Sequence, residues 1–102
     1  MTMSDQAITI AWIEKLRSNP PQAFYIREDD DGGKCAMGYL DRHPKWLNTR
    51  EASKIVWLND TYRYPLPKIA EHIRERAIHY GVLKVGEVAD PVTRKEAVAH
   101  VV

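Results

Sequence analysis

The stretch Pro65-Leu66-Pro67-Lys68-Ile69-Ala70-Glu71-His72-Ile73-Arg74-Glu75-Arg76-Ala77-Ile78-His79-Tyr80 carries the strongest secondary-structure signal in the chain. Its apolar residues recur at the spacing of one helix face, at Leu66, Ile69, Ala70, Ile73, Ala77 and Tyr80. Pro67 suits the first turn of a helix, and Gly81 suits the cap after its last turn. The pattern predicts a helix over 65–80 whose apolar stripe faces the core.

Two earlier segments also have helical periodicity. Apolar residues lie four apart at Ile8, Trp12 and Leu16. Ser4 or Asp5 can cap this first helix, and Asn19-Pro20-Pro21 must end it because proline lacks a backbone donor. The second helix is expected over 50–58, capped by Thr49 and stopped by Asn59-Asp60, and it carries Ala52, Ile55, Val56 and Leu58. We expect the 65–80 helix to pack on both.

The remaining segments favour some β structure. Residues 23–28 begin with aromatic and β-branched side chains and run into an acidic glycine turn, which predicts a short strand. The run from Lys34 to Leu40 fits either a second strand or a helix, and its helix formers favour the helix. Residues 82–88 read as a short strand or an extended arm, and Thr93 to Glu96 has the spacing of a capping box before a short final helix. The predicted fold class is therefore α+β, a helix-dominated small single domain with a minor β element.

Length and composition favour one domain in a reducing compartment. The chain has 102 residues, and we expect a globular domain over 1–81 with a C-terminal extension, 82–102, packed on the same domain. The single cysteine excludes an internal disulfide, and no apolar run is long enough to span a membrane, so a cytoplasmic protein without membrane contact is expected. The net charge of +1 supplies no global field for nucleic acid, which would need a local basic patch.

The chain carries little that points to catalysis. Cys35 is the one obvious nucleophile, and a cysteine-dependent enzyme would need one of the four histidines as its base. Packing in the core is the favoured role for Cys35, because free cysteine is among the most buried residue types. His72 and His79 lie about two helical turns apart, too far to share a metal, and are expected to be solvated. We therefore expect no metal and no cofactor.

Cations and aromatic side chains mix in the middle of the chain. The candidate binding surface consists of Lys45, Trp46, Trp57, Tyr62, Arg63 and Tyr64. Such mixtures are typical of protein-binding and nucleic-acid-binding surfaces. The alternative is that Trp46, Trp57 and Tyr64 fill the core while Arg63 is solvated.

Several short blocks occur in an order that resembles a family of small uncharacterised proteins from phages, prophages and bacteria. The blocks are 12–18, ending in Leu16-Arg17-Ser18, the Cys-x-x-Gly-x-Leu block over 35–40, Leu58-Asn59-Asp60, and the Ile-Ala-x-x-Ile helix over 69–73. The similarity covers roughly 8–76 and implies an architecture rather than a reaction. This chain departs from the pattern in its single cysteine, in Met37 and in a shortened stretch between Leu40 and Leu58.

The leading functional hypothesis is an accessory protein, of phage or prophage origin, that binds another macromolecule without catalysis. A protein is the expected partner. Two alternatives stay open: a small cysteine-dependent enzyme using Cys35, and a nucleic-acid-binding module that uses Lys45, Arg50, Arg63 and their neighbours.

Overall fold

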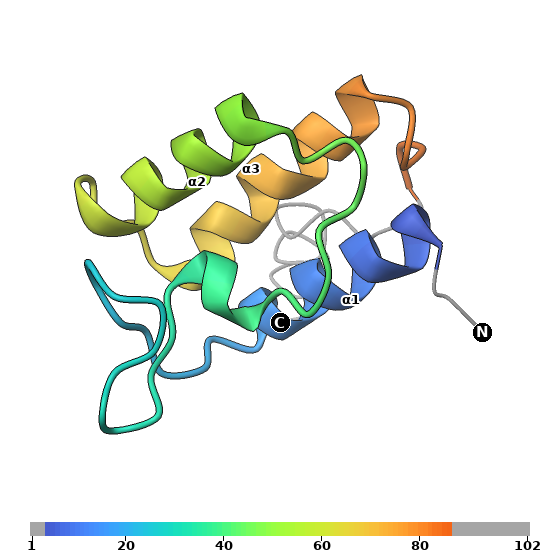
Figure 1. Cartoon of the computed structure of the whole chain (residues 1–102). Helices are drawn as coiled ribbons and strands as arrows, with labels where there is room; N and C mark the ends of the chain where they lie inside the picture. Colours follow the sequence, from blue (N-terminus) through green and yellow to red (C-terminus); the bar gives the residue numbers. More distant parts are fainter. Residues whose placement is uncertain (1–3, 87–102) are drawn as a thin grey trace, which may run out of the picture.

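The computed structural model describes residues 4–86 and consists of helices joined by loops. In chain order these are α1 (Asp5–Arg17), the 3₁₀ helix η1 (Ala36–Tyr39), α2 (Thr49–Asp60) and α3 (Leu66–His79). Helix α3 packs against both α1 and α2, and η1 packs against α1 and α2 (Figure 1). The central position of α3 agrees with the packing predicted for the 65–80 segment.

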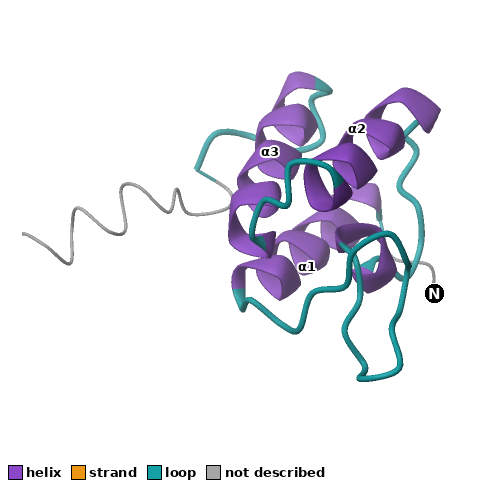
Figure 2. Cartoon of the chain, turned by 90° about the vertical axis from the view of Figure 1, so that its left-hand side faces the viewer, coloured by secondary structure: helices purple, strands orange, loops and turns teal. Residues whose placement is uncertain are grey.

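The prediction of an α+β fold is wrong, because the described residues contain no strand (Figure 2). The segment over 23–28 takes part only in an isolated bridge, between Glu28 and Lys34, and a second bridge joins Gln22 to Lys34. A strand needs a continuous partner, and Tyr25 interrupts the extended backbone with a φ of 63°. The protein is therefore a small all-α domain.

The segment after α3 also differs from its predicted form. Val82 and Leu83 both donate their backbone N–H groups to the carbonyl of Ala77, so the chain turns back on the end of α3 instead of extending. Leu83 is buried in the core. Residues 87 and 88 of the predicted arm, and the predicted final helix, lie outside the described residues.

The ends of α1 and α3 follow the predicted capping signals, whereas both ends of α2 differ: the helix runs through the predicted stop at Asn59-Asp60 and ends at Asp60, before Thr61. Ser4 caps α1 through its side-chain oxygen, which accepts from the N–H of Ala7 at 3.1 Å. Asn48 rather than Thr49 caps α2, since its Oδ1 accepts from the N–H of Glu51 at 3.0 Å. Helix α3 ends before Gly81, which has the positive φ of 76° that glycine adopts without strain.

The core lies where the three helices and η1 meet. The fully buried large side chains include Trp12, Ile13, Leu16, Leu40, Ile55, Leu66, Ile69 and Ile73. Tyr80 departs from the predicted stripe: its ring is 41% exposed, and its hydroxyl donates to Glu51 at 2.8 Å. Among the helices that the structure describes, none is both long and apolar enough to cross a membrane.

The long connection between α1 and α2 is tied to the core by side-chain hydrogen bonds. The indole of Trp12 donates to the carbonyl of Ala36 at 2.8 Å and so fixes η1 against α1. The amide of Asn59 donates to the carbonyl of Ala23 at 2.9 Å, and its Oδ1 accepts from the N–H of Ala36 at 3.1 Å. Asn59 therefore holds two distant parts of one loop through a single buried side chain.

Candidate binding surface

Exposed aromatic side chains gather where α2 ends and the chain turns into α3. We call this the aromatic surface, and it consists of Phe24, Tyr25, Lys54, Trp57, Tyr62, Arg63, Tyr64 and Lys68. Trp57 and Tyr62 pack edge to face with their ring centroids 4.4 Å apart, and Tyr64 follows at 5.5 Å from Tyr62. Trp57 is 40% exposed, Tyr62 53% and Tyr25 69%. Large side chains with this much exposure are available to a partner.

The cations of this surface lie over its rings. The Nζ atom of Lys54 is 4.3 Å from the Trp57 ring centroid, and that of Lys68 is 4.0 Å from the Tyr64 ring centroid. The guanidinium of Arg63 is 4.6 Å from the Phe24 ring centroid. These cation–π contacts hold the rings in place and occupy part of their faces.

Two residues of the aromatic surface have strained backbones. Tyr25 has a φ of 63° and Arg63 a φ of 53°, in the left-handed region that residues other than glycine rarely adopt. The conformation of Tyr25 is held by its N–H, which donates to Oδ1 of Asp60 at 2.9 Å. The same Oδ1 accepts from Asn59 at 2.7 Å. Strain that the surroundings maintain is often found at functional sites, where it presets a geometry.

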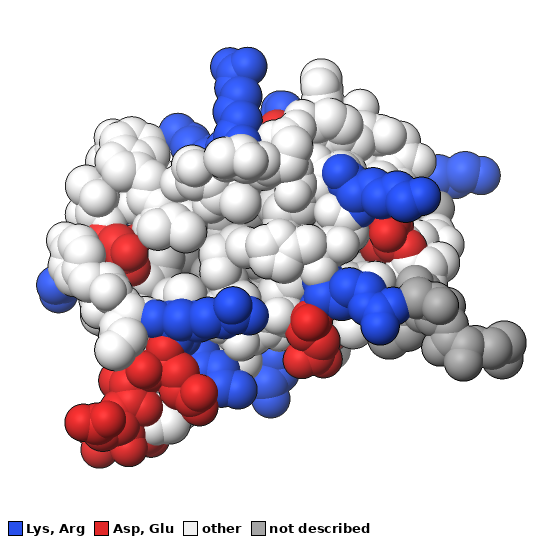
Figure 3. All heavy atoms as spheres, viewed as in Figure 1, with Lys and Arg blue, Asp and Glu red and all other residues white. Residues whose placement is uncertain are grey.

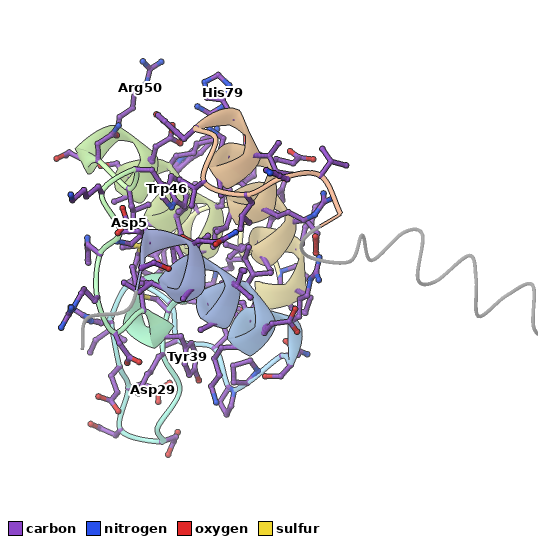
Figure 4. All side chains as sticks on the ribbon, turned by 90° about the vertical axis from the view of Figure 1, so that its right-hand side faces the viewer. Asp5, Asp29, Tyr39, Trp46, Arg50 and His79 are labelled. Carbon is purple, nitrogen blue, oxygen red and sulfur yellow. The ribbon has the colours of Figure 1, made fainter. Side chains whose placement is uncertain are left out.

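The structure separates the predicted surface residues into two groups. Trp57, Tyr62, Arg63 and Tyr64 come together, whereas Lys45 and Trp46 lie elsewhere, in the loop before α2. Trp46 is buried, donates its indole N–H to Thr9 at 3.0 Å and lies 5.8 Å from the ring of Tyr80. Figure 4 shows Trp46 inside the molecule, near Asp5, whose carboxylate accepts from the N–H of Lys45 at 3.0 Å. The prediction that Trp46 belongs to the binding surface is therefore wrong, because its side chain is part of the core.

Sequence reasoning missed four members of the surface. Phe24 and Tyr25 precede Tyr62 by more than thirty positions, and their composition predicts a strand, while Lys54 and Lys68 belong to the polar faces of helices. The one signal that could have found Lys54 is its position three residues before Trp57 on the same helix. Nothing in the sequence places Phe24 and Tyr25 beside Arg63.

Cys35 is buried at the start of η1, with 8% of its surface exposed. Within residues 4–86 it forms no hydrogen bond to a histidine, the contact that a cysteine hydrolase uses to activate its nucleophile. In the same range no three His, Cys, Asp or Glu side chains lie close enough together to hold a metal ion.

A second polar cluster joins α2 to α3. Buried Glu51 accepts two charge-assisted hydrogen bonds from Arg76, the shorter at 2.8 Å, together with the bond from Tyr80. The bonds from Arg76, ahead of the other causes, lower the pKa of Glu51 below 4.5. This cluster is fully occupied by its own partners, so it serves the packing of α2 on α3.

His72 lies beside this cluster and is not solvated as predicted, because its Nε2 is buried without a hydrogen-bond partner. Burial is the largest cause that lowers the pKa of His72 from 6.5; Glu51 opposes this shift and Lys54 and Arg76 add to it. Below about pH 6.5, His72 therefore binds a proton more readily in the unfolded chain than in the folded protein.

We expect the free energy of unfolding to fall between about pH 7.5 and about pH 5.5, and His72→Gln to flatten this dependence. Urea denaturation at the two pH values measures it. Glu51 titrates at lower pH, since its pKa lies below 4.5, and so contributes little in this window. His79→Gln, on the exposed end of α3, is the control. An unchanged slope in His72→Gln would contradict the assignment.

The described residues form a small all-helical domain with a group of exposed aromatic side chains on its surface. Comparisons of the chain with protein-family models, with curated proteins and with solved structures find no match. The resemblance to small phage and prophage proteins accordingly stays a prediction.

Proposed function

We propose that this chain is an accessory protein that binds a partner protein through the aromatic surface and performs no catalysis. The observation that carries the proposal is the exposed edge-to-face pair of Trp57 and Tyr62, followed directly by Arg63, whose guanidinium lies near the exposed ring of Tyr25. The strained backbone of Tyr25 is held by its hydrogen bond to Asp60. Tryptophan, tyrosine and arginine are the residues enriched in the energetic centres of protein interfaces. A surface set in advance also loses less conformational entropy on binding.

A protein partner is favoured over nucleic acid by the charges around the rings. Lys54, Arg63 and Lys68 already lie over aromatic faces, where stacked bases would have to lie. The carboxylate of Asp60 lies next to this surface, where it accepts a hydrogen bond from the N–H of Tyr25. The acidic residues over 28–31 project from the adjoining loop as one red corner in Figure 3 and would repel phosphate.

The mobile-element origin implied by the family resemblance belongs to the same proposal. In this proposal the protein acts by covering a functional site of a larger host assembly. A few central aromatic residues in such an interface can supply most of the affinity, and no catalytic centre is needed. The assembly can be identified by finding which proteins co-purify with this chain.

Trp57→Ala combined with Tyr62→Ala is expected to weaken partner binding by at least about a hundredfold, because truncating two central aromatic side chains removes several kcal/mol. The measurement begins with affinity capture from cells that encode the protein. The retained partner is then purified, and its Kd for the wild-type chain and for the double variant is determined by titration calorimetry.

The matched control is Arg50→Ala, an exposed residue that points away from the molecule at the start of α2 (Figure 4). It should bind the partner like the wild type. Circular dichroism must show that the double variant keeps its helices, as expected for side chains at the surface. Equal affinity of the wild type and the folded double variant would refute the proposal. Retention on DNA or RNA that is lost with added salt would favour the nucleic-acid alternative instead.

A further inference from the structure

A cavity of about 550 Å³ lies between α1 and η1, apart from the aromatic surface. Its apolar lining includes Ile8, Ala11 and Trp12 from α1, and Leu40 just after η1. This volume is in the range of pockets that hold small molecules, and such pockets combine apolar walls with a few polar groups. None of the residues that line it belongs to the aromatic surface, so it is independent of the proposed protein-binding function.

The lining of this cavity contains more cations than carboxylates. Lys15, Lys34 and Arg42 line it together with one carboxylate, that of Asp41. Glu28 and Asp29 lie close enough to Tyr39 to raise the pKa of its hydroxyl, but neither of them lines the cavity. The Nζ atoms of Lys15 and Lys34 lie 5.8 Å and 5.5 Å from the centroid of the Tyr39 ring, so this ring lies near two cations that come from different segments. Within the described part of the chain none of the three cations forms an ion pair with a carboxylate.

The walls of the cavity are held rigidly. The Trp12 indole is fixed by its bond to Ala36, and the Tyr39 hydroxyl donates to the carbonyl of Pro21 at 2.5 Å. Burial above all raises the pKa of Tyr39; a hydrogen bond with the backbone of Lys34 opposes this shift, and Asp29 and Glu28 add to it. Pro21 does not line the cavity, so the hydroxyl is engaged outside it and the ring presents its face to the two cations.

We propose that this cavity binds a small organic anion, a carboxylate attached to a flat apolar body. The apolar body would lie against Trp12, Leu40 and the Tyr39 ring, and the carboxylate would accept hydrogen bonds from Lys15 and Lys34. Two ammonium groups on the lining of one partly apolar cavity favour an anion that brings its own apolar surface, since a fully hydrated ion gains nothing from an apolar wall. Figure 4 shows Tyr39 beside α1, on the side of the molecule opposite Arg50.

The test compares two probes of the same shape, naphthoate and its uncharged analogue naphthamide. For ligands of this size we expect naphthoate to bind with a Kd of about 1 mM and naphthamide about tenfold more weakly, because the amide loses the charge-assisted bonds. Nuclear magnetic resonance titration of the full chain measures both. The backbone amides of Gly38 and Leu40, which belong to the cavity wall, should shift with naphthoate.

Lys15→Gln combined with Lys34→Gln should weaken naphthoate binding by about tenfold and leave naphthamide binding unchanged. If the double variant does not fold, Arg42→Gln is used in its place and should likewise weaken naphthoate binding more than naphthamide binding. Arg50→Gln, which removes one positive charge far from the cavity, should bind both probes like the wild type. Equal binding of the two probes, shifts confined to the aromatic surface, or no saturable shift with naphthoate would each overturn the proposal. None of these outcomes bears on partner binding through Trp57 and Tyr62.

Discussion

Asn59→Ala is expected to lower the free energy of unfolding by about 4 kcal/mol. The side chain is fully buried. Its Oδ1 accepts from the side chain of Gln22 at 3.0 Å and from the N–H of Ala36 at 3.1 Å, while its Nδ2 donates to Ala23 and Asp60. Truncation removes all four bonds and leaves buried backbone groups of the loop without partners, each at a cost of about 1–3 kcal/mol.

The matched control is Asn48→Ala, which removes the same side chain from an exposed helix cap. That change should cost about 1 kcal/mol, the usual loss for an N-cap residue. Urea denaturation of both variants, followed by circular dichroism, compares the two losses directly. Similar losses at the two positions would contradict the role of Asn59 as the tether of the loop.

The same substitution also tests how the aromatic surface is held. Asn59 donates to the Asp60 carboxylate that fixes the strained backbone of Tyr25. In Asn59→Ala this restraint is weakened, so the amide resonance of Tyr25 should shift more than those of residues in α1. A Tyr25 resonance that stays in place would show that Asp60 holds the loop without the help of Asn59.

Gly38→Ala is expected to destabilise the protein by about 3 kcal/mol, because η1 packs too closely on the preceding loop to admit a methyl group. A Cβ at this position would collide with the backbone carbonyl of Arg27 and would lie 2.9 Å from the Cβ of Lys34. Neither atom is the end of a flexible side chain, so the backbone itself must shift. For a domain of this size the melting temperature should fall by about 15 °C.

Gly81→Ala is the comparison for Gly38→Ala, because a methyl group at position 81 has enough space but requires a strained backbone conformation. A Cβ there would meet nothing within 4 Å, but the backbone has a φ of +76°. We expect a loss of about 1 kcal/mol from the strained conformation alone. Thermal unfolding of both variants measures the difference, and a Gly38→Ala loss no greater than that of Gly81→Ala would contradict the close packing of η1.

Helices were predictable because their signals are local. The stripe over 65–80 predicts α3, which spans Leu66–His79, and the four-residue spacing before Asn19 predicts α1. The strand over 23–28 was wrong for a related reason. Its composition favours extended structure, but a strand forms only if another segment pairs with it, and Lys34 offers two isolated bridges instead of a ladder.

The candidate site was predictable only in part. Trp57, Tyr62, Arg63 and Tyr64 follow one another closely at the end of α2, so their closeness in the sequence predicts that they lie close together in the structure. Trp46 has the same chemistry and lies in a similar context, yet it is buried because the loop before α2 folds over Thr9 and Tyr80. Composition alone cannot separate a tryptophan that fills a core from one that covers a surface.

The amino-acid sequence was sufficient to locate the three helices and most of their ends, because caps and periodicity act over a few residues. The folded chain was needed to bring Tyr25 beside Arg63, to place Lys15 and Lys34 on one cavity, and to make Asn59 a tether. These contacts join residues far apart along the chain. They depend on how the helices pack and on which buried polar groups must find partners, and no local pattern records either.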